Sequence, residues 1–225
     1  MPLLLVDLDN TLIDRAASLA RWAEAYLTER NGEADPALVA ELIRLDGDGL
    51  RPKPAVAADL TALLGLTPQE ESEVIAVLRA GVLEHLRPDP AVVPALEAAR
   101  SAGYVPLVVT NGNVAQQESK VRLMGLEGHV AGMVVSEGVG VRKPDAAIFH
   151  LAAEAGGDSL EGAWMIGDSA EADVRGGANA GIPQVWLRRG RSYPATEPAP
   201  TAIADSFAEA VQIVLASTGP EVRTR

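Results

Sequence analysis

Short apolar runs alternate along most of this chain with longer stretches of helical pattern, and this alternation constrains the fold more than any other feature. The first run, Leu3–Val6, is uniformly apolar and ends in polar residues, which is typical of a strand buried on both faces. The same pattern predicts further strands at Tyr104–Val109, Val130–Val135, Ala163–Ile166, Gln184–Leu187 and Thr201–Ala204, and helices near 89–102, 114–125, 144–156, 170–180 and 206–216. Strands and helices that alternate at this spacing form right-handed βαβ units. The sequence therefore predicts an open parallel sheet with helices on both faces.

One segment, residues 15–87, breaks this rhythm. It contains no convincing strand pattern, and its alanine- and leucine-rich stretches predict helices near 16–30, 36–45, 55–64 and 68–86. Pro36 and Pro68 stand where two of these helices are expected to start, a position that proline favours. We therefore predict a Rossmann-like α/β core domain formed by residues 1–14 and 88–225, with an all-helical domain at 15–87 inserted into it.

Charge and composition exclude several classes of function. The chain has 225 residues, of which 19 are Lys or Arg and 31 are Asp or Glu, so its formal net charge is −12. This charge argues against nucleic acid or an anionic membrane as the main partner. No apolar run approaches the ~18 residues that a membrane-spanning helix needs, and the first residues lack the basic region of a signal peptide. Because the chain has no cysteine, disulfides, thiolate zinc sites and cysteine nucleophiles are excluded. We expect a cytoplasmic protein that is a monomer or a homodimer.

Polar residues follow four of the predicted strands, at or just after the point where each strand ends. In chain order they are Asp7, Asp9, Thr110, Asn111, Gly112, Lys143, Asp168 and Asp173. Because ligands bind at the carboxyl ends of the strands in an open parallel sheet, we expect these residues to converge. Clustered carboxylates repel one another unless a cation lies among them, and an oxygen-only set of ligands favours Mg²⁺. A lysine and a threonine hydroxyl suit a phosphoryl group, and a carboxylate can attack phosphorus, so the set predicts metal-assisted phosphoryl transfer.

Four sequence motifs resemble, in order and spacing, those of the haloacid dehalogenase superfamily. They are DLDNT at 7–11, VVTNG at 108–112, RKP at 142–144 and GDSAEAD at 167–173. The resemblance extends over essentially the whole folded chain, and the helical insertion is similar to the cap of that superfamily's first cap class. It implies a hydrolase with a Rossmann-like core, a helical cap domain and Mg²⁺ as the cofactor.

The resemblance assigns the reacting groups. It implies that Asp7 is the nucleophile, which forms an aspartyl-phosphate, and that Asp9 protonates the leaving oxygen and then activates the water that cleaves this intermediate. It also implies that Lys143 is a catalytic residue that offsets negative charge near Asp7. An acidic residue two positions after the nucleophile is the pattern of the superfamily's phosphatases and phosphomutases, whereas its dehalogenases carry an aromatic residue there. We therefore expect a phosphatase.

The remaining motif residues are assigned to the phosphoryl group and to the metal. By the resemblance, the phosphoryl group is bound by Thr110, Asn111, Gly112 and Lys143. The Mg²⁺ ligands are the carboxylates of Asp7 and Asp168 and the backbone carbonyl of Asp9. Asp173 is expected to support the site from behind, through water or through Lys143.

The sequence leaves the substrate and two alternative functions open. We expect a small phosphorylated metabolite, such as a nucleoside monophosphate, a sugar phosphate or phosphoglycolate, because a cap that closes over the site disfavours polymers. The nearest alternative is a phosphomutase of the β-phosphoglucomutase type, in which basic cap groups hold a bisphosphate intermediate. Arg51 and Lys53 are the candidates for such groups, although solvated surface charge is the simpler interpretation of both. The alternative of another class is a non-catalytic protein that binds a phosphorylated metabolite, which the four complete motifs disfavour.

Overall fold

The computed structural model of the protein describes residues 1–217. Contacts divide the chain into two compact units. The sheet unit consists of Met1–Ile13 and the residues from Pro88 onward, and the helical unit consists of Asp14–Arg87. Each unit has a hydrophobic core of its own, so each can be described by itself.

The sheet unit is built on six parallel strands in the order β3-β2-β1-β4-β5-β6. The strands are β1 (Leu3–Val6), β2 (Val105–Thr110), β3 (Met133–Val135), β4 (Trp164–Gly167), β5 (Gln184–Leu187) and β6 (Ala202–Ala204). The chain moves outward from β1 to β3 on one side and then crosses back to β4 on the other side of β1. Ligands bind at such a switch point in open α/β sheets. The predicted parallel α/β fold is confirmed.

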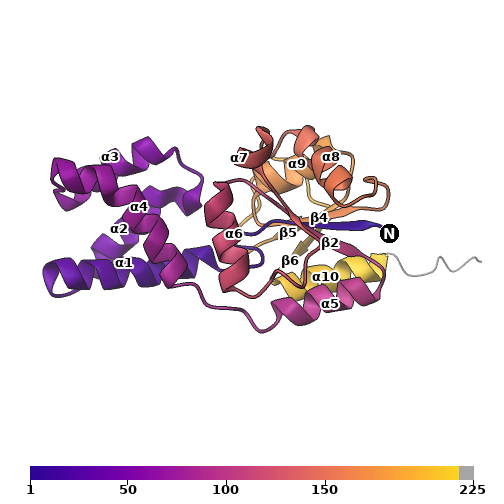
Figure 1. Ribbon diagram of the computed structural model, residues 1–225, viewed down its shortest axis with the longest axis horizontal. Coiled ribbons are helices and arrows are strands. Elements are labelled where there is room, and N and C mark those ends of the chain that lie inside the picture. Colours follow the sequence, from indigo (N-terminus) through magenta and orange to yellow (C-terminus); the bar gives the residue numbers. More distant parts are fainter. Residues whose placement is uncertain (218–225) are drawn as a thin grey trace, which may run out of the picture. The chain divides into compact units, whose positions relative to one another are not determined.

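Helices cover both faces of this sheet (Figure 1). The helices of this unit are α5 (Val92–Ser101), α6 (Val114–Leu123), α7 (Ser136–Val139), α8 (Ala146–Ala155), α9 (Gly176–Asn179) and α10 (Phe207–Ser217). α5 and α10 pack against each other on one face, and α8 and α9 lie on the opposite face (Figure 1). Side chains alternate between the faces of a strand, so Leu3 and Leu5 of β1 point the same way and pack with Phe149 of α8. Because helices cover both faces, the central strand β1 is apolar along its whole length.

Two predicted elements of the sheet unit differ in the structure. The strand expected at Val130–Val135 is limited to the three residues of β3, and before it the N–H of Ala131 donates to the carbonyl of Pro106 at 2.8 Å. The α-helix expected at 170–180 begins as a π-helix, η2 (Ala170–Arg175), and only then continues as α9. The widened turn of this π-helix carries Asp173, whose side chain bonds back to the backbone of Ser169.

The helical unit contains the predicted helices in slightly different bounds. They are α1 (Arg15–Asn31), α2 (Pro36–Asp46), α3 (Lys53–Leu64) and α4 (Pro68–Glu84), with a single 3₁₀ turn η1 (Gly47–Gly49) after α2. Pro36 and Pro68 begin α2 and α4, and the Thr67 side chain caps the second of these helices. Its core contains Leu19, Trp22, Leu27, Leu42, Leu60 and Leu78. None of the helices within residues 1–217 combines the length and the hydrophobicity needed to cross a membrane.

Candidate active site

Three of the predicted site residues lie at the carboxyl ends of three adjacent strands. Asp7 directly follows β1, Thr110 is the last residue of β2, and Asp168 directly follows β4. All three are buried, with Asp7 and Asp168 each 7% exposed and Thr110 1% exposed. Their approach is a direct consequence of the strand order, because β1 lies between β2 and β4.

The ammonium group of Lys143 lies among these strand ends. Its Nζ donates to Asp7 Oδ1 at 2.7 Å, to Asp173 Oδ1 at 2.6 Å and to the carbonyl of Val109 at 2.7 Å. The side chain of Asn111 holds the backbone of Lys143 on both sides, since its Oδ1 accepts from the Lys143 N–H at 2.9 Å and its Nδ2 donates to the Lys143 carbonyl at 3.0 Å. The amide side chain of Asn111 therefore fixes the loop that carries the lysine.

Burial and charge perturb both members of the Asp7–Lys143 pair. Burial raises the pKa of Asp7 to about 8, and although Lys143 opposes this effect, the nearby carboxylates of Asp173 and Asp168 add to it. Burial also acts to lower the pKa of Lys143, but the charges of Asp173 and Asp7 outweigh it and raise that pKa above its usual value. Lys143 is therefore a cation at neutral pH, whereas Asp7 needs further positive charge to ionise fully.

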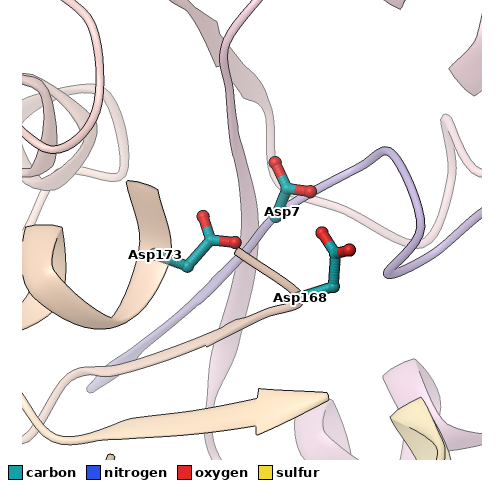
Figure 2. A group of neighbouring side chains, drawn as sticks. All are labelled: Asp7, Asp168 and Asp173. Atoms are coloured by element: carbon teal, nitrogen blue, oxygen red, sulfur yellow. The ribbon is translucent and has the colours of Figure 1, made fainter. Parts of the chain in front are cut away.

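Asp7, Asp168 and Asp173 form a cluster that suits a divalent cation. One carboxylate oxygen of each residue lies within 4.8 Å of the others, and all three residues are buried. Figure 2 shows the three side chains converging from the end of β1, the end of β4 and the helical turn that follows β4. An oxygen-only set of this kind fits Mg²⁺, and a cation beside Asp7 and Asp168 would add to the charge of Lys143, which already contacts Asp7 and Asp173.

The position of Asp173 explains the π-helix η2. Asp173 Oδ2 accepts from the backbone N–H of Ser169 at 2.9 Å, so the side chain folds back onto the start of its own helix. The N–H of Val174 also bonds to the Ser169 carbonyl, at 3.2 Å, which is the five-residue spacing of a π-helix. A Cβ atom at Gly167 would lie 2.2 Å from Asp173 Cγ, so the glycine at the end of β4 makes room for this side chain.

Asp9 takes a different direction from the three clustered acids. Its carboxylate accepts from Lys120 Nζ at 2.7 Å through both oxygens, and from Gln117 Nε2 at 3.0 Å through Oδ2. The same Gln117 nitrogen donates to Thr110 Oγ1 at 2.7 Å. Gln117 and Lys120 both belong to α6, and neither was predicted from the sequence as a site residue.

Two arginines after β5 also reach the site and were not predicted. Arg191 Nη2 donates to Asp168 Oδ2 at 2.8 Å and to the Asp168 carbonyl at 2.7 Å, and Arg189 Nη1 lies 3.5 Å from the same carboxylate oxygen. The indole N–H of Trp186 donates to the Asp168 carbonyl at 2.8 Å. The Asp168 backbone and carboxylate are thus fixed from the β5 side.

Some predicted residues have other partners in the structure. The backbone N–H of Gly112, expected to donate to a phosphoryl group, donates to Ser136 Oγ at 3.0 Å. In the helical unit, Arg51 donates to Asp59 at 2.6 Å and Lys53 Nζ donates to the carbonyl of Gly49 at 3.3 Å. Arg51 and Lys53 are therefore partly buried and engaged inside their own unit.

Comparison with known proteins finds one matching family model and relatives that are phosphatases. Residues 1–181 match the model of the haloacid dehalogenase-like hydrolase family. A phosphoglycolate phosphatase of Agrobacterium fabrum is 31% identical over 213 residues, which cover 92% of this chain and 89% of that enzyme. A pyrimidine 5′-nucleotidase of Escherichia coli is 36% identical over 128 residues, which cover only 56% of each chain, so the match spans about half of that relative.

A solved structure reproduces the fold over nearly the whole chain. The HAD-hydrolase YfnB of Bacillus subtilis, determined with bound magnesium, aligns with a TM-score of 0.82 at 23% sequence identity. The alignment covers 95% of this chain and 98% of that one.

Proposed function

The chain belongs to the haloacid dehalogenase-like hydrolase family, and from this premise we propose that it is a Mg²⁺-dependent phosphatase that hydrolyses a small phosphorylated metabolite through an aspartyl-phosphate. The observation that carries the proposal is the pair of acids at the end of β1. Asp7 is held by the Lys143 cation, and Asp9, two residues later, is held by the Lys120 cation. We assign the nucleophile to Asp7 and the proton donor and acceptor to Asp9, and the separate cation beside each acid supports this division.

In the first step, a carboxylate oxygen of Asp7 attacks the phosphorus of the substrate. The bond between phosphorus and the leaving oxygen breaks, and Asp9 in its protonated form, in which the oxygen that carries the proton turns from the Lys120 or Gln117 donor to the leaving oxygen, passes its proton there, so an alcohol leaves. Lys143 stays protonated throughout and offsets the charge of the transferred phosphoryl group beside Asp7.

In the second step, the ionised Asp9 removes a proton from water. The water oxygen attacks phosphorus, the bond between phosphorus and the Asp7 oxygen breaks, and inorganic phosphate leaves. Asp7 is again a carboxylate and Asp9 is again protonated, so both acids return to their starting states.

The carboxylates of Asp7 and Asp168, with the backbone carbonyl of Asp9, would hold the Mg²⁺ ion. The bound ion supplies positive charge that neutralises phosphoryl oxygens and favours the ionised form of Asp7. The pKa of Asp7, which burial raises, agrees with this assignment, because a cation beside the buried carboxylate would favour its ionised form. Asp173 binds Lys143 and Ser169, and its role is to orient the lysine.

We assign the transfer chemistry to the core, residues 1–14 and 88–225, and the selection of the leaving group to the helical cap, residues 15–87. A small phosphorylated metabolite is the substrate class that fits this division. The 31% identity to a phosphoglycolate phosphatase over 92% of the chain supports a phosphorylated acid, and the partial match to a nucleotidase supports a nucleoside monophosphate.

Phosphate release from a panel of phosphate monoesters with Mg²⁺ tests the proposal, with Asp7→Asn as the matched blank. We expect release from one chemical class of substrate in the wild type and none in the variant. Conversion of a sugar phosphate to its isomer, activated by a bisphosphate, would instead identify a phosphomutase. Binding of metabolites without turnover in either reaction would identify the non-catalytic alternative.

A further inference from the structure

Helix α6 carries two polar side chains that are buried as deeply as core residues. Gln117 and Lys120 are each 2% exposed, and they lie three residues apart on one side of the helix. Burial of a lysine costs free energy unless its charge is paired and its hydrogen bonds are made. The partners of these two side chains therefore indicate why they are present.

Gln117 and Lys120 form hydrogen bonds with each other, with the Asp9 carboxylate and with the Thr110 hydroxyl. An ammonium group has three N–H bonds, and Lys120 Nζ has three acceptors at 2.7 Å, namely the two carboxylate oxygens of Asp9 and Gln117 Oε1. Because the Gln117 carbonyl oxygen faces the lysine, its amide nitrogen faces the other way. There it donates to Asp9 Oδ2 at 3.0 Å and to Thr110 Oγ1 at 2.7 Å.

This arrangement fixes two groups at once. Contacts to both of its oxygens hold the Asp9 carboxyl in a single orientation. Because Thr110 Oγ1 accepts from Gln117, the hydroxyl hydrogen of Thr110 is directed to a different acceptor. A phosphoryl oxygen is the acceptor that the proposed function provides.

We propose that Lys120 and Gln117 are positioning residues for proton transfer: they orient the Asp9 carboxyl toward the leaving oxygen and the Thr110 hydroxyl toward the phosphoryl group. The inference rests on the proposed role of Asp9 and adds to it the groups that hold this acid in place. It differs from a purely stabilising ion pair, because a stabilising pair has no reason to affect one class of substrate more than another.

Leaving groups that differ in basicity separate these roles. An alkyl phosphate needs a proton on its leaving oxygen, whereas p-nitrophenyl phosphate releases a stable anion and does not. In single-turnover measurements of leaving-group release, the step before the hydrolysis that both substrates share, we expect Lys120→Met to lower the rate for an alkyl phosphate by about 10²-fold, the scale of a misplaced catalytic group, and the rate for p-nitrophenyl phosphate only a few-fold. KM should change little for either substrate, and Lys120→Arg, which keeps the charge, should recover part of the alkyl phosphate rate.

Because Lys120→Met could fail to fold, Gln117→Leu provides a second test. This variant keeps the ion pair between Lys120 and Asp9. It should give the same substrate-dependent loss, and circular dichroism and thermal unfolding report whether each variant is native. Arg122→Met is the matched control, because Arg122 lies on the same helix with 66% of its side chain exposed, and both of its rates should equal those of the wild type.

Equal losses in the rate of leaving-group release for the two substrates in folded Lys120→Met and Gln117→Leu, or no loss in either, would overturn the inference while leaving the phosphatase in place. A wild-type enzyme that releases phosphate from neither substrate, nor from any other monoester, would overturn the proposed function itself and the inference with it.

Discussion

The Lys143 ammonium group lies 2.7 Å from a carboxylate oxygen of Asp7, and both side chains are buried. The same ammonium group holds Asp173 at 2.6 Å, so one cation is shared by two acids. With Asp7 ionised, the group of three carries a net negative charge, which a metal ion beside Asp7 would offset.

Removal of the Lys143 charge should greatly lower the kcat of phosphate release. In Lys143→Met the transferred phosphoryl group loses a cation that the protein holds in advance, and we expect kcat to fall by about 10²–10³-fold. Steady-state phosphate release measures this loss. Arg142→Met is the control, because Arg142 is the exposed neighbour of Lys143 in the chain, and it should keep the wild-type rate. Equal rates in the two variants would refute a catalytic role for Lys143.

Mg²⁺ should stabilise the folded protein as well as activate it. Chelation with EDTA should abolish phosphate release, and added Mg²⁺ should restore it. An ion that binds only the native state adds about 2.7 kcal/mol to the free energy of unfolding at 100 times its Kd, which a thermal melt detects. Asp168→Asn removes one carboxylate of the cluster and should lose most of this rise. The same Mg²⁺-dependent rise in wild type and variant would show that the ion binds elsewhere.

Gly167 should tolerate no side chain. A Cβ atom there would lie 2.2 Å from Asp173 Cγ, so Gly167→Ala must displace the acid that holds Lys143 and Ser169. We expect a loss of about 1–3 kcal/mol in the free energy of unfolding and a clear fall in kcat. Gly128→Ala, at an exposed glycine with no atom within 4 Å of the added Cβ, should change neither quantity. Urea unfolding measures the free energy of unfolding of the two variants. Equal values would contradict the close contact between Gly167 and Asp173.

The helical unit should lose stability in acid through one buried ion pair. Arg15 contacts both oxygens of Asp46, at 2.7 and 3.0 Å. Burial alone would raise the pKa of Asp46, but the hydrogen bonds and charge of Arg15, with the charge of Lys53, outweigh it and hold that pKa below its ordinary value. The folded state therefore binds this proton less tightly than the unfolded chain does. The contribution of the pair is complete above the unfolded pKa, ~3.9, and is lost as the pH falls through the lower folded pKa.

Asp46→Asn tests this contribution. At pH 7 it leaves Arg15 buried without its counter-charge, which should cost about 3–5 kcal/mol, and the remaining stability should fall less steeply in acid than that of the wild type. The matched control is Asp59→Asn, whose side chain is 42% exposed in the same unit and which should follow the wild-type pH dependence. Denaturant unfolding from about pH 2 to 7, with several points below the ordinary aspartate pKa of ~3.9, measures all three proteins. Parallel pH curves for Asp46→Asn and wild type would contradict this assignment.

The sequence predicts the framework of the site because the framework depends on periodicity. Leu3–Val6 is apolar and ends at Asp7, and the run that contains β4 ends just before Asp168. Once the strands are parallel and adjacent, both acids must lie at the same edge of the sheet. The periodicity predicts the shared edge, whereas the strand order that makes β1 and β4 neighbours comes from the structure.

Other parts of the site depend on packing that residue type does not reveal. Helix α6 is mostly polar, and nothing in its composition separates the buried Gln117 and Lys120 from the exposed Glu118. The only available signal is that the helix starts a few residues after Thr110. The π-helix could not be predicted from the sequence either, because its widened turn accompanies the contact of Asp173 with Ser169 and does not follow from a pattern of apolar residues.

Trapping of the phosphorylated enzyme tests the central claim most directly. The wild type, Asp7→Asn and Asp9→Asn are mixed with ³²P-labelled p-nitrophenyl phosphate and Mg²⁺, quenched in acid and measured for protein-bound label. Asp9→Asn can still be phosphorylated, because this leaving group needs no proton, but it cannot activate water, so we predict label approaching one phosphate per chain in Asp9→Asn and none in Asp7→Asn. Label of equal amount in the Asp7 variant, or none in an Asp9 variant that still releases p-nitrophenolate, would contradict Asp7 as the nucleophile.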